Sequence, residues 1–248
     1  MRFDVITLFP ELFDPFLKVG ITRRAYETGQ VQVELTNPRD FASGNYRRVD
    51  DRPFGGGPGM VMMAEPLEKA LLAIRASRKD HAPVLLFSPI GQTLNHAAVE
   101  RWSASEGAIL VCGRYEGIDQ RFIDRYVDGQ ISLGDFVLSG GELAAMAMLD
   151  AIARLQPGVL SDADSHHQDS FNPALDGLLD CPHYTRPDTW AEQPVPAVLM
   201  SGHHEQIERW RRQQRLALTA QHRPDLLETA RQQGLLDKRD EQYLADKP

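Results

Sequence analysis

Short apolar runs alternate with amphipathic segments through the first 160 residues. β-Branched and apolar residues at 3–9 and 31–36 predict two strands, each followed by a proline. The runs 83–87 and 108–112 are almost wholly apolar, which is typical of parallel strands covered on both faces. Residues 65–79, which precede these runs, place leucines and an isoleucine at helical spacing. The pattern predicts an α/β layered domain.

The pattern changes beyond residue 155. Residues 156–180 have little apolar periodicity and are predicted to form a long loop, and 187–196 form a second irregular stretch. Helices are predicted at 204–221 and 224–233, the second of which starts at a proline and is followed by a glycine. The chain therefore divides into an α/β part and a mainly helical part.

The composition is that of an ordinary globular protein. Its 248 residues are 42% hydrophobic and 25% charged, which excludes a disordered or fibrous chain. The two cysteines, Cys112 and Cys181, exclude a disulfide framework and a zinc knuckle and favour a reducing, cytoplasmic setting. Asp4 and Glu11 interrupt the first apolar run, so no signal peptide is expected, and no apolar run is long enough to span a membrane.

The net charge of −8 disfavours uniform binding to polyanions, so a nucleic-acid-binding chain would need local basic patches. Helix 204–221 offers one such patch. On a helical wheel, one side collects Ile207, Trp210, Gln214, Ala217 and Leu218. The other side collects Arg209, Arg211, Arg212 and Arg215. Such a side suits a phosphate backbone, and a solvated arginine-rich surface is the alternative interpretation.

Residues 55–59 form the densest run of glycines. The run lacks the Lys-Ser/Thr ending of a phosphate-binding P-loop and does not complete G-x-G-x-x-G, because Met60 stands at the last position. Arg47, Arg48 and Arg52 flank it and could meet phosphates. Two interpretations stay open: a flexible turn, and a backbone that approaches a ligand closely.

Residues 113–119 (GRYEGID) follow directly on a predicted buried strand. Ligand sites in α/β sheets favour the carboxyl ends of strands, which makes this segment a candidate pocket wall. Gly113 and Gly117 would let the backbone offer N–H and C=O groups to a heterocycle. A tight strand-to-helix turn is the alternative.

Residues 133–142 end in a helix-start signal. Ser139 and Glu142 stand three positions apart ahead of an apolar run, which predicts a capping box. The helix predicted at 143–153 is apolar almost all round, so we expect it to be buried in a core or at a subunit interface. The Gly140-Gly141 turn is predicted to lie against a ligand, and a capped core helix is the alternative.

Histidines raise the question of a metal site. His166, His167 and His183 have aspartates nearby. The chain has neither an H-E-x-x-H motif nor a regularly spaced set of cysteines and histidines. No metal ligands are predicted.

Four motifs follow one another along the chain: residues 51–60 (DRPFGGGPGM), 111–119 (VCGRYEGID), 132–143 (SLGDFVLSGGEL) and 178–187 (LLDCPHYTRP). Together they resemble the bacterial tRNA (guanine-37-N1)-methyltransferases, and the likeness extends through essentially the whole chain. The resemblance implies a knotted parallel-sheet α/β domain of the SPOUT class at 1–160, with a trefoil knot. It further implies a linker at 161–175, a small all-helical tRNA-binding domain at 176–248, and a homodimer whose subunits share each active site.

The resemblance also implies S-adenosyl-L-methionine as the methyl donor, bound by loops that follow three strands. By motif match, the residues expected to bind it are Ser88, Pro89, Gly113, Tyr115, Glu116, Leu133, Gly134, Asp135, Phe136, Val137, Leu138, Gly140 and Gly141. Mg²⁺ is associated with the activity. The sequence shows no dedicated carboxylate cage, so an ion would act through the substrate or the cofactor.

The resemblance assigns the catalytic chemistry to two residues. Asp169 is expected to take the proton from N1 of guanine 37, and Arg154 to stabilise the negative charge that moves onto O6. The expected function is methylation of this N1 beside the anticodon, which supports reading-frame maintenance. The residues expected to bind tRNA are Arg52, Ser170, His183, Arg186, Arg209, Arg212 and Arg215.

Two other functions stay open. A related knotted methyltransferase could act on another RNA position. A non-catalytic RNA-binding dimer would have lost the cofactor. The glycine loops at two strand ends count against the second alternative, because a simple RNA binder has no need of them.

Overall fold

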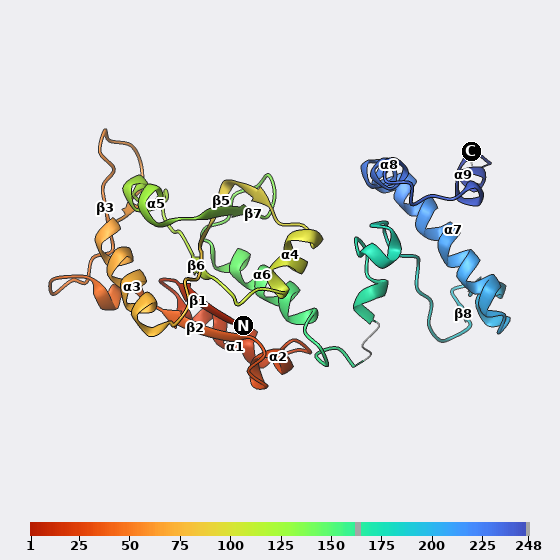
Figure 1. The fold of residues 1–248 in the computed structure, drawn as a ribbon, viewed down its shortest axis with the longest axis horizontal. Helices are drawn as coiled ribbons and strands as arrows, with labels where there is room; N and C mark the ends of the chain where they lie inside the picture. The colour runs from red at the N-terminus through yellow and green to blue at the C-terminus, as the bar shows by residue number, and fades with distance from the viewer. Residues whose placement is uncertain (162–164, 247–248) are drawn as a thin grey trace. The chain divides into compact units, whose positions relative to one another are not determined.

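The computed structural model describes residues 1–161 and 165–246 (Figure 1). The chain forms two compact units, Met1–Ser161 and Asp162–Pro248. The first unit has nearly the bounds of the predicted domain 1–160, whereas the predicted separate linker 161–175 falls in the second unit except for its first residue, Ser161. Each unit has its own hydrophobic core.

A sheet of five parallel strands forms the centre of the first unit. The strands lie in the order β2 (Gln32–Thr36), β1 (Arg2–Ile6), β6 (Ile109–Val111), β5 (Val84–Thr93) and β7 (Gly129–Ser132). The apolar runs predict the first four, whereas β7 has no such run and becomes a strand by pairing with β5. The predicted strand 3–9 ends early because Pro10 starts a 3-10 helix, η1 (Pro10–Leu12).

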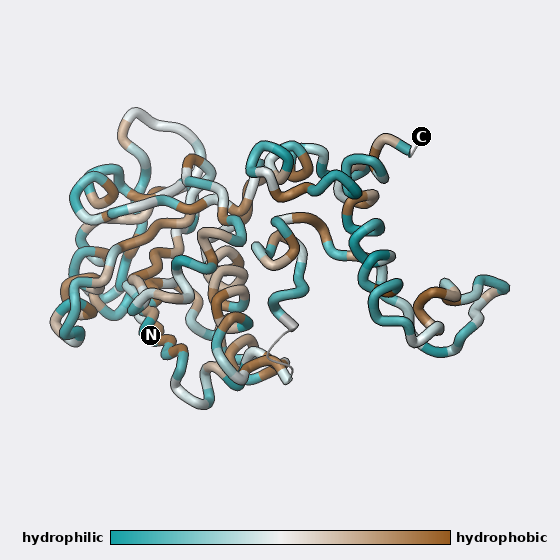
Figure 2. Tube along the Cα trace, turned by 45° about the vertical axis from the view of Figure 1, so that its right-hand side comes forward, coloured by the Kyte–Doolittle hydropathy of each residue, from teal (hydrophilic) through white to brown (hydrophobic). Residues whose placement is uncertain are grey.

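Helices cover both faces of this sheet and create two cores. One face carries α1 (Phe13–Lys18), α2 (Arg23–Glu27), α4 (His96–Ser103) and α6 (Glu142–Arg154). The other face carries α3 (Ala64–Ser77) and α5 (Gln120–Tyr126). Phe3 and Val5 of β1 point into the first core and Ile6 into the second, as alternation along a strand requires. Apolar residues of this unit show as brown stretches in Figure 2. The α/β class is confirmed, and the knot stays a prediction from the resemblance.

Smaller elements complete the first unit. A 3-10 helix, η2 (Pro38–Phe41), follows β2. A short antiparallel hairpin pairs β3 (Asp50–Asp51) with β4 (Val61–Met62). The glycine run 55–59 lies in the loop between these two strands and is thereby attached to the domain at both ends.

The pairing of β5 with β7 is interrupted, and the interruption shapes the site. Phe87 and Gln92 both align with Ile131, so the residues between them leave the ladder. A Cβ at Gly91 would lie 2.4 Å from the backbone nitrogen of Ile131. Because no side chain fits there, glycine at this position lets the end of β5 bulge away from the sheet.

The predicted capping box at Ser139 and Glu142 is wrong. The N-cap of α6 is Gly141, and no side chain caps the first turn. The Glu142 side chain is buried instead, and its Oε1 accepts a hydrogen bond from the Thr7 hydroxyl at 2.9 Å. One face of the helix is buried in the core, and Leu143 on another side is 56% exposed in the single chain, so burial of that side at a subunit interface stays a prediction.

The second unit is mainly helical. Its longer helices are α7 (His204–His222), α8 (Pro224–Gln232) and α9 (Lys238–Ala245). Its short 3-10 helices are η3 (Ser165–Gln168), η4 (Pro173–Leu175) and η5 (Ala197–Met200). The unit also contains a hairpin that the sequence does not predict, β8 (Thr189–Trp190) paired with β9 (Gln193–Pro194). Its core is small and is built on Leu178, Leu216, Leu227 and Ala230.

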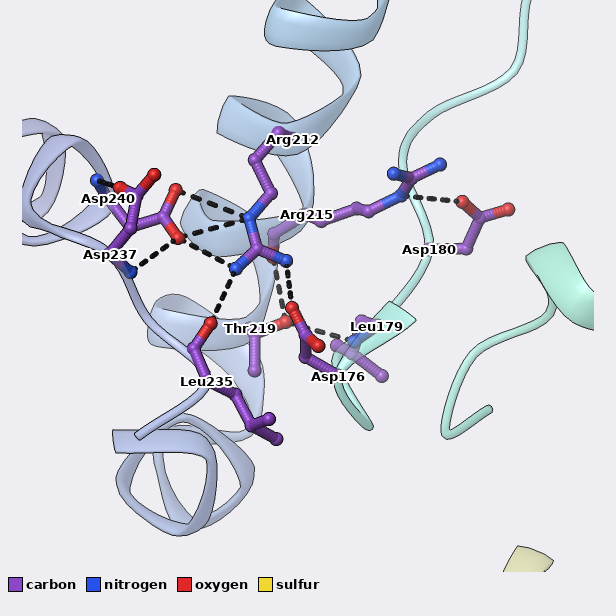
Figure 3. A network of polar contacts seen from close by, with 9 residues as sticks. All are labelled: Asp176, Leu179, Asp180, Arg212, Arg215, Thr219, Leu235, Asp237 and Asp240. Atoms are coloured by element: carbon purple, nitrogen blue, oxygen red, sulfur yellow. Dashed lines mark hydrogen bonds and ion pairs between the residues drawn. The ribbon is translucent and has the colours of Figure 1, made fainter. Parts of the chain in front are cut away.

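Ion pairs supplement this small core (Figure 3). The Arg212 guanidinium donates to Asp176 and to Asp240, with 2.7 Å between the closest atoms in each case. Arg215 is buried, and its Nε donates to Asp180 at 3.4 Å. These contacts connect α7 to the segment before it and to the start of α9.

The predicted orientation of α7 is therefore wrong in part. The wheel places Arg212 and Arg215 toward solvent, yet the buried side of the helix consists of Arg215, Leu216 and Thr219. Ile207 and Trp210, predicted as its inner side, are half-buried. The positions of the apolar residues do not predict the buried side of α7, because most residues of this helix are polar, as its teal colour in Figure 2 shows.

The Asp180 carboxylate is expected to make the stability of the second unit depend on pH. Burial alone would raise its pKa, but the Cys181 N–H, His183 and Arg215 outweigh burial and hold the pKa below its ordinary value. A carboxylate whose pKa is lower in the folded than in the unfolded protein stabilises the fold. This stabilisation is fully present above the unfolded-state pKa of about 4, and it is lost as the pH falls through the folded-state pKa.

The Tm of Asp180→Asn is therefore expected to fall less steeply than that of the wild type as the pH is lowered below about 4. The measurement is Tm against pH by circular dichroism. Asp188→Asn, at an exposed carboxylate of the same unit, is the matched control and should keep the wild-type slope. Identical slopes for the two variants would contradict this role of Asp180.

Candidate functional site

A cavity of about 370 Å³ lies at the carboxyl ends of β5, β6 and β7. This is the end of a parallel sheet where α/β proteins bind ligands, and the volume is in the range of small-molecule sites. Every residue expected to bind the methyl donor lines it, except Asp135. These residues are Ser88, Pro89, Gly113, Tyr115, Glu116, Leu133, Gly134, Phe136, Val137, Leu138, Gly140 and Gly141.

The Gly140-Gly141 turn lies at this cavity, as predicted, and the packing explains its residue type. A Cβ on Gly141 would lie 2.8 Å from the Cα atom of Cys112, and a Cβ on Gly140 would lie 2.2 Å from Nε of Arg114. The Gly141 N–H donates to the Gly113 carbonyl at 3.0 Å. The backbones of the loops after β6 and β7 are thus in direct contact along one wall.

The end of the glycine run and the residues directly after it pack against the same loop. The Glu116 N–H donates to the Met60 carbonyl, and the Met62 N–H donates to the Gly117 carbonyl, both at 2.9 Å. Glu116 lines the cavity. Gly59 therefore lies close to a cavity loop, whereas the interpretation as a flexible turn stays open for the exposed residues 55–57.

Gly59→Ala is expected to weaken binding of S-adenosylmethionine about tenfold, equivalent to about 1.4 kcal/mol. A Cβ there would lie 2.4 Å from Oε1 of Glu116, so this cavity side chain would have to move. Isothermal titration calorimetry measures the change in Kd. Gly44→Ala is the control, because its φ is similarly positive while nothing lies within 4 Å. An equal loss of affinity in both variants would mean that backbone strain alone is responsible.

Part of the cavity wall is not found by sequence analysis. Ile90 and Ile123 add apolar surface to it, whereas Arg114 and Ile118 belong to the segment 113–119 that the sequence predicts as a pocket wall. Ile90 could have been predicted to lie at the cavity, because it follows the apolar run 83–87 and parallel strands end at the same edge of the sheet. Ile123 lies on α5, and no local pattern indicates that it reaches the cavity.

The two residues expected to act in catalysis belong to different units. Arg154 is the last residue of α6, and Asp169 follows η3. Both are half-buried. The Asp169 N–H donates to the His166 carbonyl at 3.4 Å, and its carbonyl accepts from the Asn172 N–H at 3.2 Å. A compact turn thus fixes the backbone of Asp169, and both catalytic roles stay predictions.

The residues expected to bind tRNA differ in their surroundings. Four are exposed: Arg52, His183, Arg186 and Arg209. Ser170 is half-buried, and its hydroxyl accepts the Asp180 N–H at 2.9 Å. Arg212 and Arg215 form the ion pairs described above. Arg52 also lines a second cavity, of about 850 Å³, together with Arg121 and Arg125.

The search for metal and membrane sites covers the described residues. Among 1–161 and 165–246, no group of three or more His, Cys, Asp or Glu side chains could hold a metal ion. His166 and His167 lie with their rings 4.0 Å apart, and His183 contacts Asp180 at 2.8 Å. In the same part of the chain, no helix has both the length and the apolar character needed to cross a membrane.

The fold and the cavity define the class: an α/β protein with a small-ligand site on glycine-rich loops at the carboxyl end of a parallel sheet. A family model described as tRNA (Guanine-1)-methyltransferase TrmD matches residues 1–229. The chain belongs to this family of enzymes. The family expected from the four sequence motifs is thereby confirmed.

Relatives match along nearly their whole length, and each is named tRNA (guanine-N(1)-)-methyltransferase. The protein from Albidiferax ferrireducens is 74% identical over 245 residues, covering 99% of both chains. The protein from Polaromonas sp. is 72% identical over 250 residues, covering 99% of this chain and 96% of the relative. The protein from Methylibium petroleiphilum is 63% identical over 255 residues, covering 100% and 98%.

Proposed function

We propose that this enzyme transfers a methyl group from S-adenosylmethionine to N1 of guanine 37 in tRNA. The main support for this proposal is the glycine-lined cavity at the ends of three strands, in a chain that belongs to this family. The names of the relatives point to guanine N1. Position 37, next to the anticodon, follows from the sequence motifs and connects the activity to reading-frame maintenance.

The cavity suits S-adenosylmethionine in size and in chemistry. The loops at 113–117 and 133–141 bring backbone peptide groups to the cavity wall, and groups of this kind can hydrogen-bond an adenine. Leu133, Leu138 and Phe136 supply apolar surface that can enclose the base. When bound, the cofactor supplies an electrophilic methyl group on a sulfonium sulfur.

The proposed proton transfer uses Asp169 as the general base. Guanine N1 carries a proton and is a poor nucleophile until the proton is removed. The Asp169 carboxylate takes this proton, and the nitrogen lone pair then forms the bond to the methyl carbon as the carbon–sulfur bond breaks. Arg154 stabilises the negative charge that develops on O6 while the proton leaves. S-adenosylmethionine held by the cavity loops would supply the methyl group, and its sulfur would keep the electrons of the broken bond as a neutral thioether.

The proposed RNA contacts combine exposed arginines from both units. Arg186 and Arg209 belong to the second unit and Arg52 to the first, and all three are exposed. Guanidinium groups are well suited to phosphates because they donate two hydrogen bonds in one plane. The net charge of −8 then requires that binding rely on these local groups.

We further propose a homodimer whose subunits share each active site. The exposed side of α6 supports it, because Leu143 and Ala147 leave apolar surface open to solvent beside the cavity loop. A second copy of this chain would cover that surface.

Leu143→Asp is therefore expected to give a monomer with little methyl-transfer activity. Size-exclusion chromatography with light scattering measures the mass. Leu72→Asp on α3 is the matched control, because Leu72 is 50% exposed and lies on the other face of the sheet. A Leu143→Asp variant that stays dimeric would contradict this interface.

Two finer expectations accompany the proposal. Mg²⁺ would act through the tRNA or the cofactor, because the described residues provide no three-ligand cluster for it. The substrate is a cytoplasmic RNA, so we expect a cytoplasmic enzyme.

The deciding experiment is methyl transfer from labelled S-adenosylmethionine to unmodified tRNA with G37, beside the same tRNA with A37. Label on the G37 transcript alone, mapped to N1, is the expected result. Equal label on both transcripts would favour a methyltransferase for another RNA position. Tight tRNA binding with no label on either would favour a non-catalytic RNA-binding dimer.

A further inference from the structure

A buried ion pair lies behind the cavity. The Nε atom of Arg114 is 2.9 Å from Oε2 of Glu142, and the Glu142 side chain is 1% exposed. Glu142 is the first residue of α6, and Arg114 follows β6 at the edge of the cavity. Neither residue is among those expected to bind the methyl donor or the tRNA.

Side chains from several strand ends meet at this pair. Thr7, which directly follows β1, is fully buried, and its hydroxyl donates to Oε1 of Glu142 at 2.9 Å. The same hydroxyl accepts the Phe9 N–H at 3.0 Å, and the Arg114 guanidinium carbon lies 4.5 Å from the centre of the Phe9 ring. Nη1 of Arg114 donates to the Ser139 carbonyl at 3.2 Å. One network therefore connects the end of β1 to both cavity loops.

The pair determines how closely these two loops approach. Arg114 and Gly140 form an isolated antiparallel bridge. A Cβ on Gly140 would overlap both partners, at 2.2 Å from Nε of Arg114 and 2.5 Å from Oε2 of Glu142. The loops thus pack around charged atoms. Because a buried charge that loses its partner is strongly unfavourable, the loop that carries Arg114 is restricted to the position that keeps this contact.

We propose that Glu142, Arg114 and Thr7 are positioning residues that hold the loops after β6 and β7 at the separation required by S-adenosylmethionine. The identity of that ligand rests on the proposed function. The three residues act through the backbone of 113–117 and 138–141, and none is assigned contact with the methyl group that moves. Their loss is therefore expected to change donor binding more than turnover.

Glu142→Gln removes the charge while keeping the shape of the side chain. In the ligand-free protein, amide hydrogen exchange is expected to accelerate in segments 113–117 and 133–141. The Kd for S-adenosylmethionine, measured by calorimetry, is expected to rise about tenfold to hundredfold. In methyl-transfer assays the KM for the donor should rise in parallel, while kcat at saturating donor and the KM for tRNA stay near their wild-type values.

Asp4→Asn is the matched control. Asp4 is as buried as Glu142 and pairs with Arg78, which is more buried than Arg114, and neither Asp4 nor Arg78 lines the cavity. This control should lose thermal stability without a change in donor Kd. The proposal is overturned if Glu142→Gln leaves exchange and Kd unchanged, or if Asp4→Asn raises the Kd equally. A wild-type protein that binds no S-adenosylmethionine would instead refute the proposed function, and the exchange rates would still test the pair.

Thr7→Val provides a milder second test if Glu142→Gln does not fold. It removes only the hydroxyl that holds the carboxylate and preserves the volume of the side chain. A smaller rise in Kd, with faster exchange in the same segments, is expected. Thr7→Ser restores the hydroxyl and should return both readings toward wild type. Wild-type exchange rates and a wild-type Kd in the Thr7→Val variant would contradict a positioning role for Thr7.

Discussion

Asp169→Ala is expected to lower the rate of methyl transfer by about 10²- to 10⁴-fold, the usual contribution of a general base. Without the carboxylate, the N1 proton has no acceptor among the groups assigned to catalysis. Affinity for tRNA should change little, because the proposed phosphate contacts come from exposed arginines and Asp169 is not among them. Single-turnover transfer from labelled S-adenosylmethionine gives the rate, and filter binding gives the tRNA affinity.

Two further variants make the Asp169 result specific. Asp169→Asn keeps the shape and removes the base, so it should be as slow as the alanine variant. Asp188→Ala removes an exposed carboxylate from the same unit and should retain full activity. Near-wild-type turnover by Asp169→Ala with bound tRNA would refute the assignment of the base.

Gly141→Ala is expected to reduce affinity for S-adenosylmethionine about tenfold to hundredfold. The new methyl group would lie 2.8 Å from Cα and 3.3 Å from Cβ of Cys112, and 3.3 Å from the backbone nitrogen of Gly113. Backbone cannot turn aside as a flexible side chain can, so one cavity wall must move. Overpacking of this kind costs about 1–3 kcal/mol, which corresponds to this loss if the bound state needs the native wall.

The φ angle of Gly141 is −79°, so alanine brings no backbone strain and the effect comes from the contact alone. Calorimetry measures the Kd. Gly158→Ala is the control, because nothing lies within 4 Å of its added Cβ. Its affinity should equal that of the wild type. An unchanged Kd for Gly141→Ala would show that this wall tolerates displacement.

Features that depend on neighbouring residues in the chain are predicted well. The apolar runs at 83–87 and 108–112 become β5 and β6, although β5 extends to Thr93. The segments after them line the cavity because parallel strands end at one edge. The start of α8 at Pro224 follows from the restricted backbone of proline.

Features that depend on distant partners are predicted poorly. Ser139 and Glu142 have capping-box spacing, yet the Glu142 carboxylate bonds Thr7, which is 135 residues away. The wheel of α7 assigns arginines to solvent, but Asp176, Asp180 and Asp240 lie where they can pair with them. A charged side chain is buried when a partner compensates its desolvation, and no local pattern shows that partner.

By itself the sequence determined the α/β class, the family, the segments that line the cavity and the division into two units. Hydrophobic periodicity, glycine and proline act over a few residues, and long motifs identify a family without coordinates. Only the tertiary structure decided which glycines have no room for a side chain, that Gly59 lies against the Glu116 side chain, and that Arg114 pairs with the buried Glu142. These features depend on distances between segments that are far apart in the chain, and folding alone brings those segments together.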